Sequence, residues 1–201
     1  MPHLGDAAVP MWVCIACSVW VAILIPAYIR HFGWANFLWF SDLSLFMTVA
    51  ALWLNSQWLF SMAIISVVLL EVIWNVDYFT RLISGRRTIG LTDYMFNPRY
   101  PKPVRALSLF HIWLLVLWVW LLPRIGYESR AWMAQSVVCW IVLIVTYTLT
   151  PREQNVNWVF GLGPKPQKRF PPLLYLGMLM IALPTLVYFP THLLLQWWTT
   201  R

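Results

Sequence analysis

The sequence predicts an all-α membrane protein, a bundle of about six transmembrane helices forming one domain over residues 1–201. Hydrophobic residues make up 61% of the chain and charged residues only 10%. Soluble domains are about half apolar and a quarter charged. Apolar stretches of about 20 residues, the length that crosses a hydrocarbon core of about 30 Å, recur along the chain. The chain also has 15 Trp, a residue that concentrates at membrane interfaces.

The first half of the chain contains three apolar stretches separated by short polar breaks. The first is followed by Arg30 and His31, and the Asn55-Ser56 turn separates the second from the third. The third stretch ends at Arg81, where the longest polar segment of the chain begins. The expected spans are therefore 11–29, 35–54 and 57–80.

The second half contains three more apolar stretches, bounded by Pro-containing loops. Pro123 follows the fourth stretch, and Pro151 follows the fifth. Pro184 and Pro190 lie inside the sixth, where we expect them to bend the helix because proline lacks a backbone N–H. The expected spans are 106–122, 131–150 and 173–197.

The distribution of basic residues predicts the orientation of the bundle. Alternating spans place residues 30–34, 81–105 and 152–172 on one side, and these segments contain 11 of the 14 Lys and Arg residues. Lys and Arg are enriched in cytoplasmic loops. We therefore expect a multi-pass protein of a bacterial inner membrane, with these loops in the cytoplasm and both termini on the opposite side.

Ionisable residues occur inside the predicted spans, where they are energetically costly and usually functional. Asp42 lies in the second span, Glu71 in the third and His111 in the fourth, each toward the predicted cytoplasmic side. These three are the predicted catalytic residues, with His111 as the acid or base and Asp42 or Glu71 orienting it. Interhelical polar contacts contribute only about 0.6–2 kcal/mol, which is too little to explain a buried carboxylate by stability alone. A purely structural role for the acids is the alternative.

Further polar residues are predicted near the same depth. Asn75 is four residues after Glu71, so a helix places the two on one face. The predicted pocket-lining residues are Ser41, Asn75, Asp77, Tyr78, Thr146, Asn155 and Asn157. The residues predicted to bind a lipid head group are Arg86, Arg87, Lys168 and Arg169. For these basic residues, the alternative is a role in topology and in attraction to anionic lipid.

The spacing of these residues does not indicate a site for a metal ion or a cofactor. Neither an H-x-x-x-H nor an E-x-x-H pattern is present, so we predict no metal ion and no cofactor. A nucleophile system built from Ser41 or Ser44 with His111 and an acid is conceivable. A nucleic-acid partner is not expected, because the positive charge follows the loops of a membrane protein.

Three segments give the chain a resemblance to a known family. They are Phe40–Phe46, the Phe110-His111 pair and Asn155–Gly161. In these segments the chain resembles the YwaF-like integral membrane proteins of bacteria, which have an animal relative described as a phospholipid acyltransferase. Ser41 stands where that family often has Cys, and Trp158 where it often has Tyr. The resemblance implies acyl chemistry on a lipid.

Three functions therefore remain open from the sequence. The first is an enzyme that transfers or hydrolyses acyl groups of membrane lipids. The second is a transporter of protons or small solutes, in which the same acids carry the charge. The third is a structural or assembly subunit, for which the expected partners include other membrane proteins as well as lipids.

Overall fold

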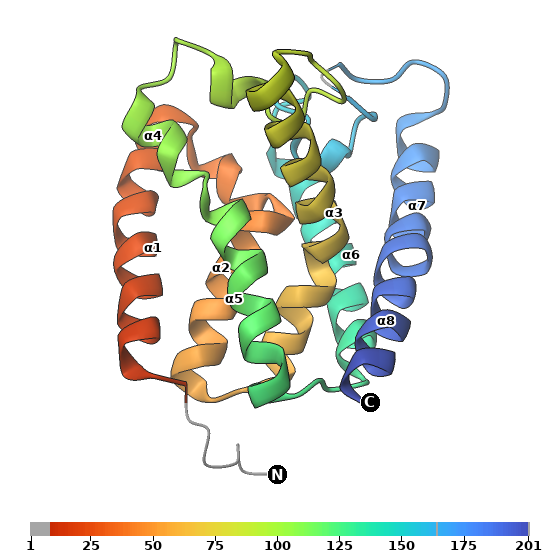
Figure 1. Cartoon of the computed structure of the whole chain (residues 1–201). Helices are drawn as coiled ribbons and strands as arrows, with labels where there is room; N and C mark the ends of the chain where they lie inside the picture. The colour runs from red at the N-terminus through yellow and green to blue at the C-terminus, as the bar shows by residue number, and fades with distance from the viewer. Residues whose placement is uncertain (1–8, 164, 201) are drawn as a thin grey trace.

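The computed structural model describes residues 9–163 and 165–200, which form an all-helical bundle without strands (Figure 1). Most of the chain is in α-helices. They are α1 (Met11–His31), α2 (Phe40–Leu54), α3 (Gln57–Ser84), α4 (Lys102–Leu107), α5 (Phe110–Ile125), α6 (Ala131–Leu149), α7 (Pro172–Ala182) and α8 (Phe189–Thr199). Four shorter elements complete the described part, namely the 3-10 helices η1 (Trp34–Leu38), η2 (Asp93–Phe96) and η3 (Val156–Trp158) and the π-helical turn η4 (Leu183–Tyr188).

Five helical segments of the described chain are long and apolar enough to span a membrane, as in a multi-pass membrane protein. They are Met11–His31, Gln57–Ser84, Lys102–Ile125, Ala131–Leu149 and Pro172–Thr199. These segments coincide with five of the six predicted spans, with ends that differ by a few residues.

The predicted second span is not one continuous helix. Residues 34–38 form η1, and the extended backbone of Trp39 separates η1 from α2. Helix α2 has only 15 residues, which corresponds to a length of about 22 Å and is too short for a hydrocarbon core of about 30 Å. It is a short helix packed inside the bundle.

Helix α3 lies at the centre of the bundle because it is apolar on all sides in its first half. Every residue from Phe60 to Val67 is buried, as expected for a helix without a polar face. Helix α2 packs along α3, after a turn in which Asn55 adopts a left-handed conformation with φ of 48°. Ser44 donates a hydrogen bond to the carbonyl oxygen of Ala63 (2.7 Å) and fixes this pair of helices.

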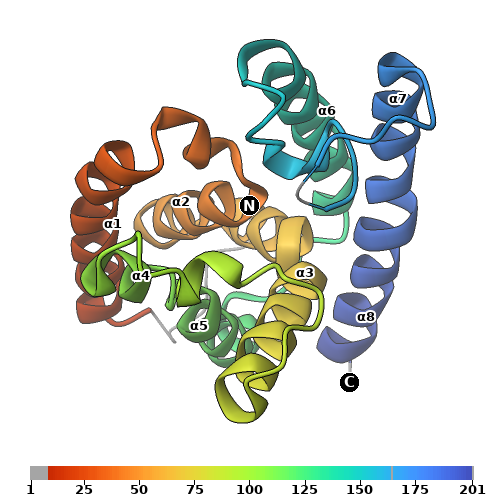
Figure 2. The same ribbon diagram turned by 90° about the horizontal axis from the view of Figure 1, so that it is seen from above.

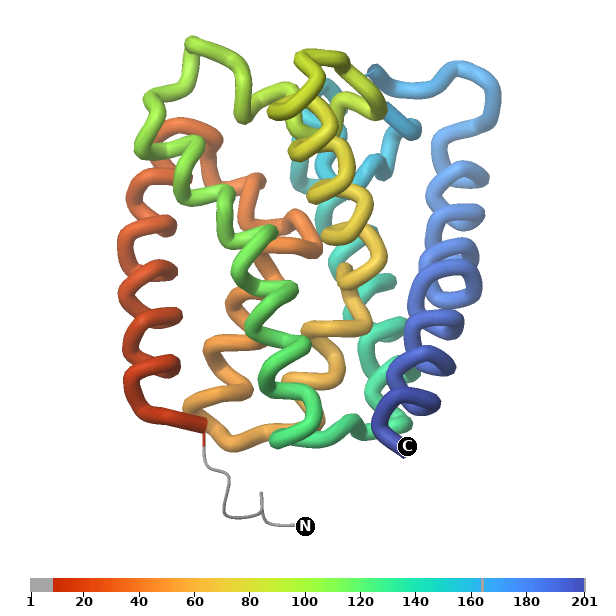
Figure 3. The backbone as a smooth tube through the Cα atoms, viewed as in Figure 1, coloured from red at the N-terminus to blue at the C-terminus, as the bar shows by residue number. Residues whose placement is uncertain are grey.

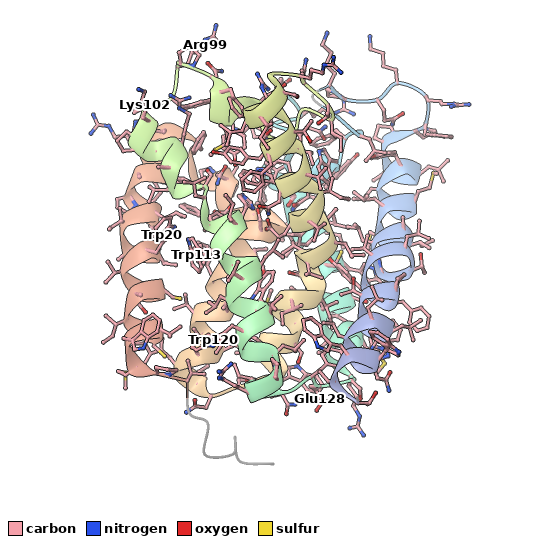
Figure 4. All side chains as sticks on the ribbon, in the orientation of Figure 1. Trp20, Arg99, Lys102, Trp113, Trp120 and Glu128 are labelled. Atoms are coloured by element: carbon pink, nitrogen blue, oxygen red, sulfur yellow. The ribbon has the colours of Figure 1, made fainter. Side chains whose placement is uncertain are left out.

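The remaining helices surround this central pair. Seen from above, α1 lies on one flank and α7 with α8 on the other (Figure 2). The start of α1 and the end of α8 lie at the same end of the bundle (Figure 1). The two long loops, 85–101 and 150–171, lie together at the opposite end (Figure 3). Arg99 and Lys102 are at this loop end, whereas Glu128 is at the terminal end (Figure 4).

The irregularity predicted in the last span takes the form of the π-helical turn η4. Pro184 has no N–H to bond to the carbonyl oxygen of Met180, four residues earlier. That oxygen instead accepts a hydrogen bond from Trp140 Nε1 on α6 (2.8 Å). The missing helix bond is thereby replaced by a contact between helices.

Candidate functional site

The centre of the candidate site is a buried pair formed by Glu71 of α3 and His111 of α5. His111 Nδ1 and Glu71 Oε2 are 2.6 Å apart, and Glu71 is 2% exposed. The side chain of Asn75 donates to the carbonyl oxygens of both Glu71 and His111, each at 2.8 Å. The structure thus brings together three of the predicted residues at the contact between α3 and α5.

Aromatic rings fix the orientation of the His111 imidazole. Trp74 stacks on His111 with ring centroids 4.4 Å apart, and Phe110 also stacks on it at 4.1 Å. Tyr78 extends the stack by lying on Trp74 at 5.2 Å. With Nδ1 bonded to Glu71, no described residue forms a hydrogen bond with the other nitrogen, Nε2. The His111 side chain remains 10% exposed.

Asp42 lies in the first turn of α2, where the helix N-terminus favours a negative charge. The residue is 3% exposed, and its Oδ2 accepts a hydrogen bond from Asn36 at 3.3 Å. Its Oδ1 is buried without a partner, and so is Oε1 of Glu71. The two carboxylates are close enough to interact electrostatically. All three predicted catalytic residues therefore belong to one buried region.

Segment η2 covers this region on the loop side. Tyr94 of η2 interacts with Ser108 and Trp74, and burial raises the pKa of the Tyr94 phenol above its ordinary value, which leaves it a neutral hydrogen-bond donor. Beside it, the hydroxyl groups of Tyr28 and Ser108 are 2.6 Å apart. At the loop end, η2 therefore covers the region in which a polar pocket was predicted.

Several residues of this region were not predicted from the sequence. They are Tyr28, Asn36, Trp74, Tyr94, Ser108 and Phe110. A signal existed for Trp74, which follows Glu71 by three residues and so lies on the same helical face. The other five come from other elements, and only the folded chain places them beside Glu71.

Asp77, which was predicted to line the pocket, bonds in the structure to the loop after α3. Its two carboxylate oxygens accept hydrogen bonds from the hydroxyl and backbone groups of the loop after α3. The donors are the Thr88 hydroxyl, the Ile89 and Gly90 amides, and the Thr92 amide and hydroxyl. Because these donors occupy both carboxylate oxygens, Asp77 holds the loop after α3 in place. Arg81, one helical turn after Asp77, pairs with Asp93.

Asn155 and Asn157 also bond to backbone groups rather than to the acids. Asn155 donates to the carbonyl oxygens of Gly161 and Gly163 and accepts from the amide of Phe160. Asn157 donates to Leu38 O (2.7 Å) and accepts from Phe40 N (3.1 Å). These two bonds attach η3 to the start of α2. No hydrogen bond joins either asparagine to the acids among the described residues, and their role as pocket-lining residues stays a prediction.

The Asn157 contact leads to a testable prediction about stability. Asn157→Ala removes both bonds and leaves Phe40 N and Leu38 O without this partner. It also places alanine at a left-handed backbone position, where φ is 51°. We expect a loss of about 2–3 kcal/mol in the free energy of unfolding. The measurement is denaturant unfolding in detergent, followed by tryptophan fluorescence. Gln154→Ala, at an exposed neighbouring position, serves as the control, and an equal effect of both variants would contradict the prediction.

The other predicted pocket residues are less closely connected to the pair. Tyr78 reaches His111 only through Trp74. Ser41 is half-buried, and no hydrogen bond from a described residue reaches its hydroxyl, whereas Ser44 is committed to Ala63. Thr146 is fully buried on α6, and its hydroxyl has no partner among the described residues.

The basic residues predicted to bind a head group lie in the loops at the same end of the bundle as the acids. Arg86, Lys168 and Arg169 are exposed. Arg87 is also exposed, but it pairs with Asp93. The guanidinium group of Arg169 lies over the Phe170 ring at 5.8 Å. Their role in lipid binding stays a prediction.

Two apolar grooves lie on the flanks of the bundle. A groove of about 540 Å³ runs between α3 and α5 and is lined by Asn75, Phe79, Ile83 and Leu115, among others. A second groove, of about 560 Å³, lies between α1 and α5. Its lining includes Trp20, Trp113 and Trp120, which follow one another along the bundle (Figure 4).

Comparisons with known proteins give no family for this chain. No protein-family model, no curated protein and no solved structure matches it. Among the described residues, no group of three or more His, Cys, Asp and Glu side chains is arranged to hold a metal ion. The chemistry of the site is therefore argued from its own geometry.

Proposed function

We propose that this protein is a membrane-embedded enzyme that transfers or hydrolyses an acyl group of a lipid, with His111 as its acid and base. The observation that carries the proposal is the buried bond between His111 Nδ1 and Glu71 Oε2, at 2.6 Å. A carboxylate on Nδ1 holds the proton there and leaves Nε2 as the basic nitrogen. The same division of roles occurs in hydrolases that use a histidine oriented by an acid.

The reaction that this arrangement supports has two proton transfers. In the first, Nε2 of His111 takes the proton of a hydroxyl group or water as the oxygen attacks the ester carbonyl carbon. Glu71 stabilises the imidazolium ion that forms, and the stacked rings of Trp74 and Phe110 keep it in place. In the second, the imidazolium ion returns its proton to the departing alkoxide. The hydroxyl of Ser41, the position that often holds Cys in YwaF-like proteins, is the nucleophile we propose for acyl transfer. A second round of the same two proton transfers then moves the acyl group from Ser41 to an acceptor hydroxyl, or to water, and restores the Ser41 hydroxyl.

A lipid substrate is supported by the groove between α3 and α5. Asn75 lines this groove and also bonds to the backbone of Glu71 and His111. The groove continues along α3 to Ser84, and Arg86 and Arg87 follow directly in the loop. We propose that the acyl chain occupies the groove while the basic loops attract the head group, on the cytoplasmic side of a bacterial inner membrane. The resemblance to the YwaF-like proteins agrees with such chemistry.

The test is lipid turnover by the purified protein in vesicles of defined phospholipids, measured by mass spectrometry of the lipids. His111→Gln is expected to lower the turnover rate by about 10²–10⁴-fold, the usual contribution of a general acid–base group. His192→Gln is the matched control, because His192 is also buried and hydrogen-bonded, to Tyr127 (2.7 Å), but belongs to α8. We expect this variant to keep its activity.

The proposal is overturned if His111→Gln, folded as judged by its elution volume and helix content, turns lipids over as fast as the unchanged protein. It is also overturned if the unchanged protein modifies no lipid but moves protons into vesicles, with the movement lost in Glu71→Gln. Isolation in a fixed ratio with other membrane proteins, without turnover, would favour a structural role instead.

A further inference from the structure

The buried region around Glu71 has more negative than positive groups. Asp42 and Glu71 supply two carboxylates, and His111 is the one titratable base bonded to either of them in the described chain. The side-chain partner of Asp42 is the neutral amide group of Asn36. Even with a protonated imidazole, two ionised carboxylates leave one negative charge without compensation. A buried charge without a partner costs several kcal/mol, so the region requires a further positive group or a proton.

The unpaired atoms of this region point to where the positive group binds. Asp42 Oδ1 and Glu71 Oε1 are both buried and have no hydrogen-bond partner. Their residues are only 3% and 2% exposed, so bulk water does not compensate them. Buried polar atoms in proteins are nearly always hydrogen-bonded. Two acceptors of this kind, on carboxylates that interact with each other, suit a ligand that donates several hydrogen bonds.

Aromatic side chains lie near the two acids. Tyr28 and Tyr94 are close enough to Asp42 to interact with its charge, and Tyr94 is close enough to Glu71 as well. Tyr94 in turn lies beside Trp74. The faces of tyrosine and tryptophan rings attract organic cations, by about 0.5–2 kcal/mol per contact. Carboxylates enclosed by aromatic rings bind ammonium groups, whereas metal ions prefer a larger set of oxygen ligands.

We propose that Asp42 and Glu71, with Tyr28, Trp74 and Tyr94, form a binding site for a primary ammonium group. The ammonium group donates hydrogen bonds to Asp42 Oδ1 and Glu71 Oε1, and the rings contact its remaining surface. The site rests on the proposed function in one respect only, namely that the ammonium group belongs to the substrate or to a product. Either a free amine or the amino head group of a lipid supplies this chemistry.

The first experiment uses ethylammonium chloride as the probe, with the purified protein in detergent at constant ionic strength. Thermal unfolding is followed by tryptophan fluorescence as the probe concentration rises. We expect a saturating increase in Tm, roughly 3–5 °C at ten times the Kd. Asp42→Asn, which has nearly the same shape, should lose this increase. Glu153→Gln removes a carboxylate from an exposed loop position and should keep it.

A second variant covers the case in which Asp42→Asn does not fold. Tyr94→Leu changes a residue of η2, outside the long helices, and is expected to weaken ethylammonium binding roughly threefold to thirtyfold. Ethanol, a neutral molecule of similar size, should not raise Tm in a saturating manner. The proposal is overturned if ethanol and ethylammonium act alike, or if neither variant changes the response to ethylammonium.

Infrared spectroscopy tests the competing explanation, in which a proton neutralises the region. A carbonyl stretch of a protonated carboxylic acid that disappears in Asp42→Asn, together with no saturating effect of ethylammonium, would overturn the proposal.

Phospholipids with identical chains and ethanolamine, choline or glycerol head groups then distinguish a lipid head group from a free amine as the source of the ammonium group. Preferential retention of the ethanolamine lipid in native mass spectrometry identifies a head group, and equal retention with ethylammonium binding identifies a free amine.

The results also separate this site from the proposed function. Lipid turnover that depends on His111 but shows no ammonium binding would reject the site and keep the enzyme. Ammonium binding that depends on Asp42 in a protein without lipid turnover would keep the site and reject the enzyme.

Discussion

Glu71→Gln is expected to lower lipid turnover by about 10²–10⁴-fold while the protein stays folded. The amide of glutamine carries no charge, so it cannot stabilise the imidazolium ion that forms when His111 accepts a proton. Its NH₂ group can also face Nδ1 and select the wrong tautomer of the imidazole. The measurement is the rate of lipid turnover in vesicles, with Glu153→Gln as a control for the same change at an exposed position.

A double variant distinguishes a catalytic pair from two independent structural residues. Residues that act as one unit in catalysis have strongly non-additive effects. Glu71→Gln combined with His111→Gln should therefore lower turnover by about as much as His111→Gln alone. Additive losses, or losses that follow the decrease in the free energy of unfolding, would show that Glu71 acts through stability.

Asp77→Ala is expected to reduce the free energy of unfolding by about 3–5 kcal/mol. The substitution removes an acceptor that five hydrogen-bond donors of the loop share. The acceptor itself is buried, since Asp77 is 1% exposed, and among the three backbone amides that lose it the amide of Thr92 belongs to a fully buried residue. Asp77→Asn keeps one carbonyl oxygen, so its loss should be smaller.

Hydrogen exchange identifies the site of this effect. The amides of Ile89, Gly90 and Thr92 should lose protection in Asp77→Ala, while the amides of α3 between Phe60 and Val67 keep theirs. Glu153→Ala is the control for the loss of an exposed acid at the same end of the bundle. Unchanged exchange at the three loop amides would contradict the role that the structure gives to Asp77.

The sequence predicted much of the fold because the requirements of a bilayer are local. Each span needs about 20 apolar residues, and this property is visible without knowledge of any contact. The second span shows where such reasoning ends. Residues 35–54 are apolar enough for one helix, yet the contacts of Asn157 with Leu38 and Phe40 lie beside a break at Trp39. Asn157 is more than a hundred residues away, so no local pattern could reveal this.

Some residues of the candidate site could likewise be found from the sequence, and others only from the fold. The cost of placing an ionisable group at membrane depth was enough to select Asp42, Glu71 and His111 from the sequence. The same reasoning could not foresee that hydrogen bonds to the following loop satisfy the carboxylate of Asp77. It also could not find Tyr94, which lies in a loop and reaches the acids only through the placement of η2.

By itself, the sequence determined the class of the protein, the approximate positions of its long apolar helices and the helical segments that carry its acids. These follow from composition and from spacing along a helix, which act over a few turns. The tertiary structure alone decided that Glu71 bonds to His111, that Asp42 is left with an unpaired oxygen and that η2 covers them. Glu71 and His111 are 40 positions apart, and the nearby pair of Tyr28 and Ser108 is 80 positions apart, so their geometry depends on how the helices pack.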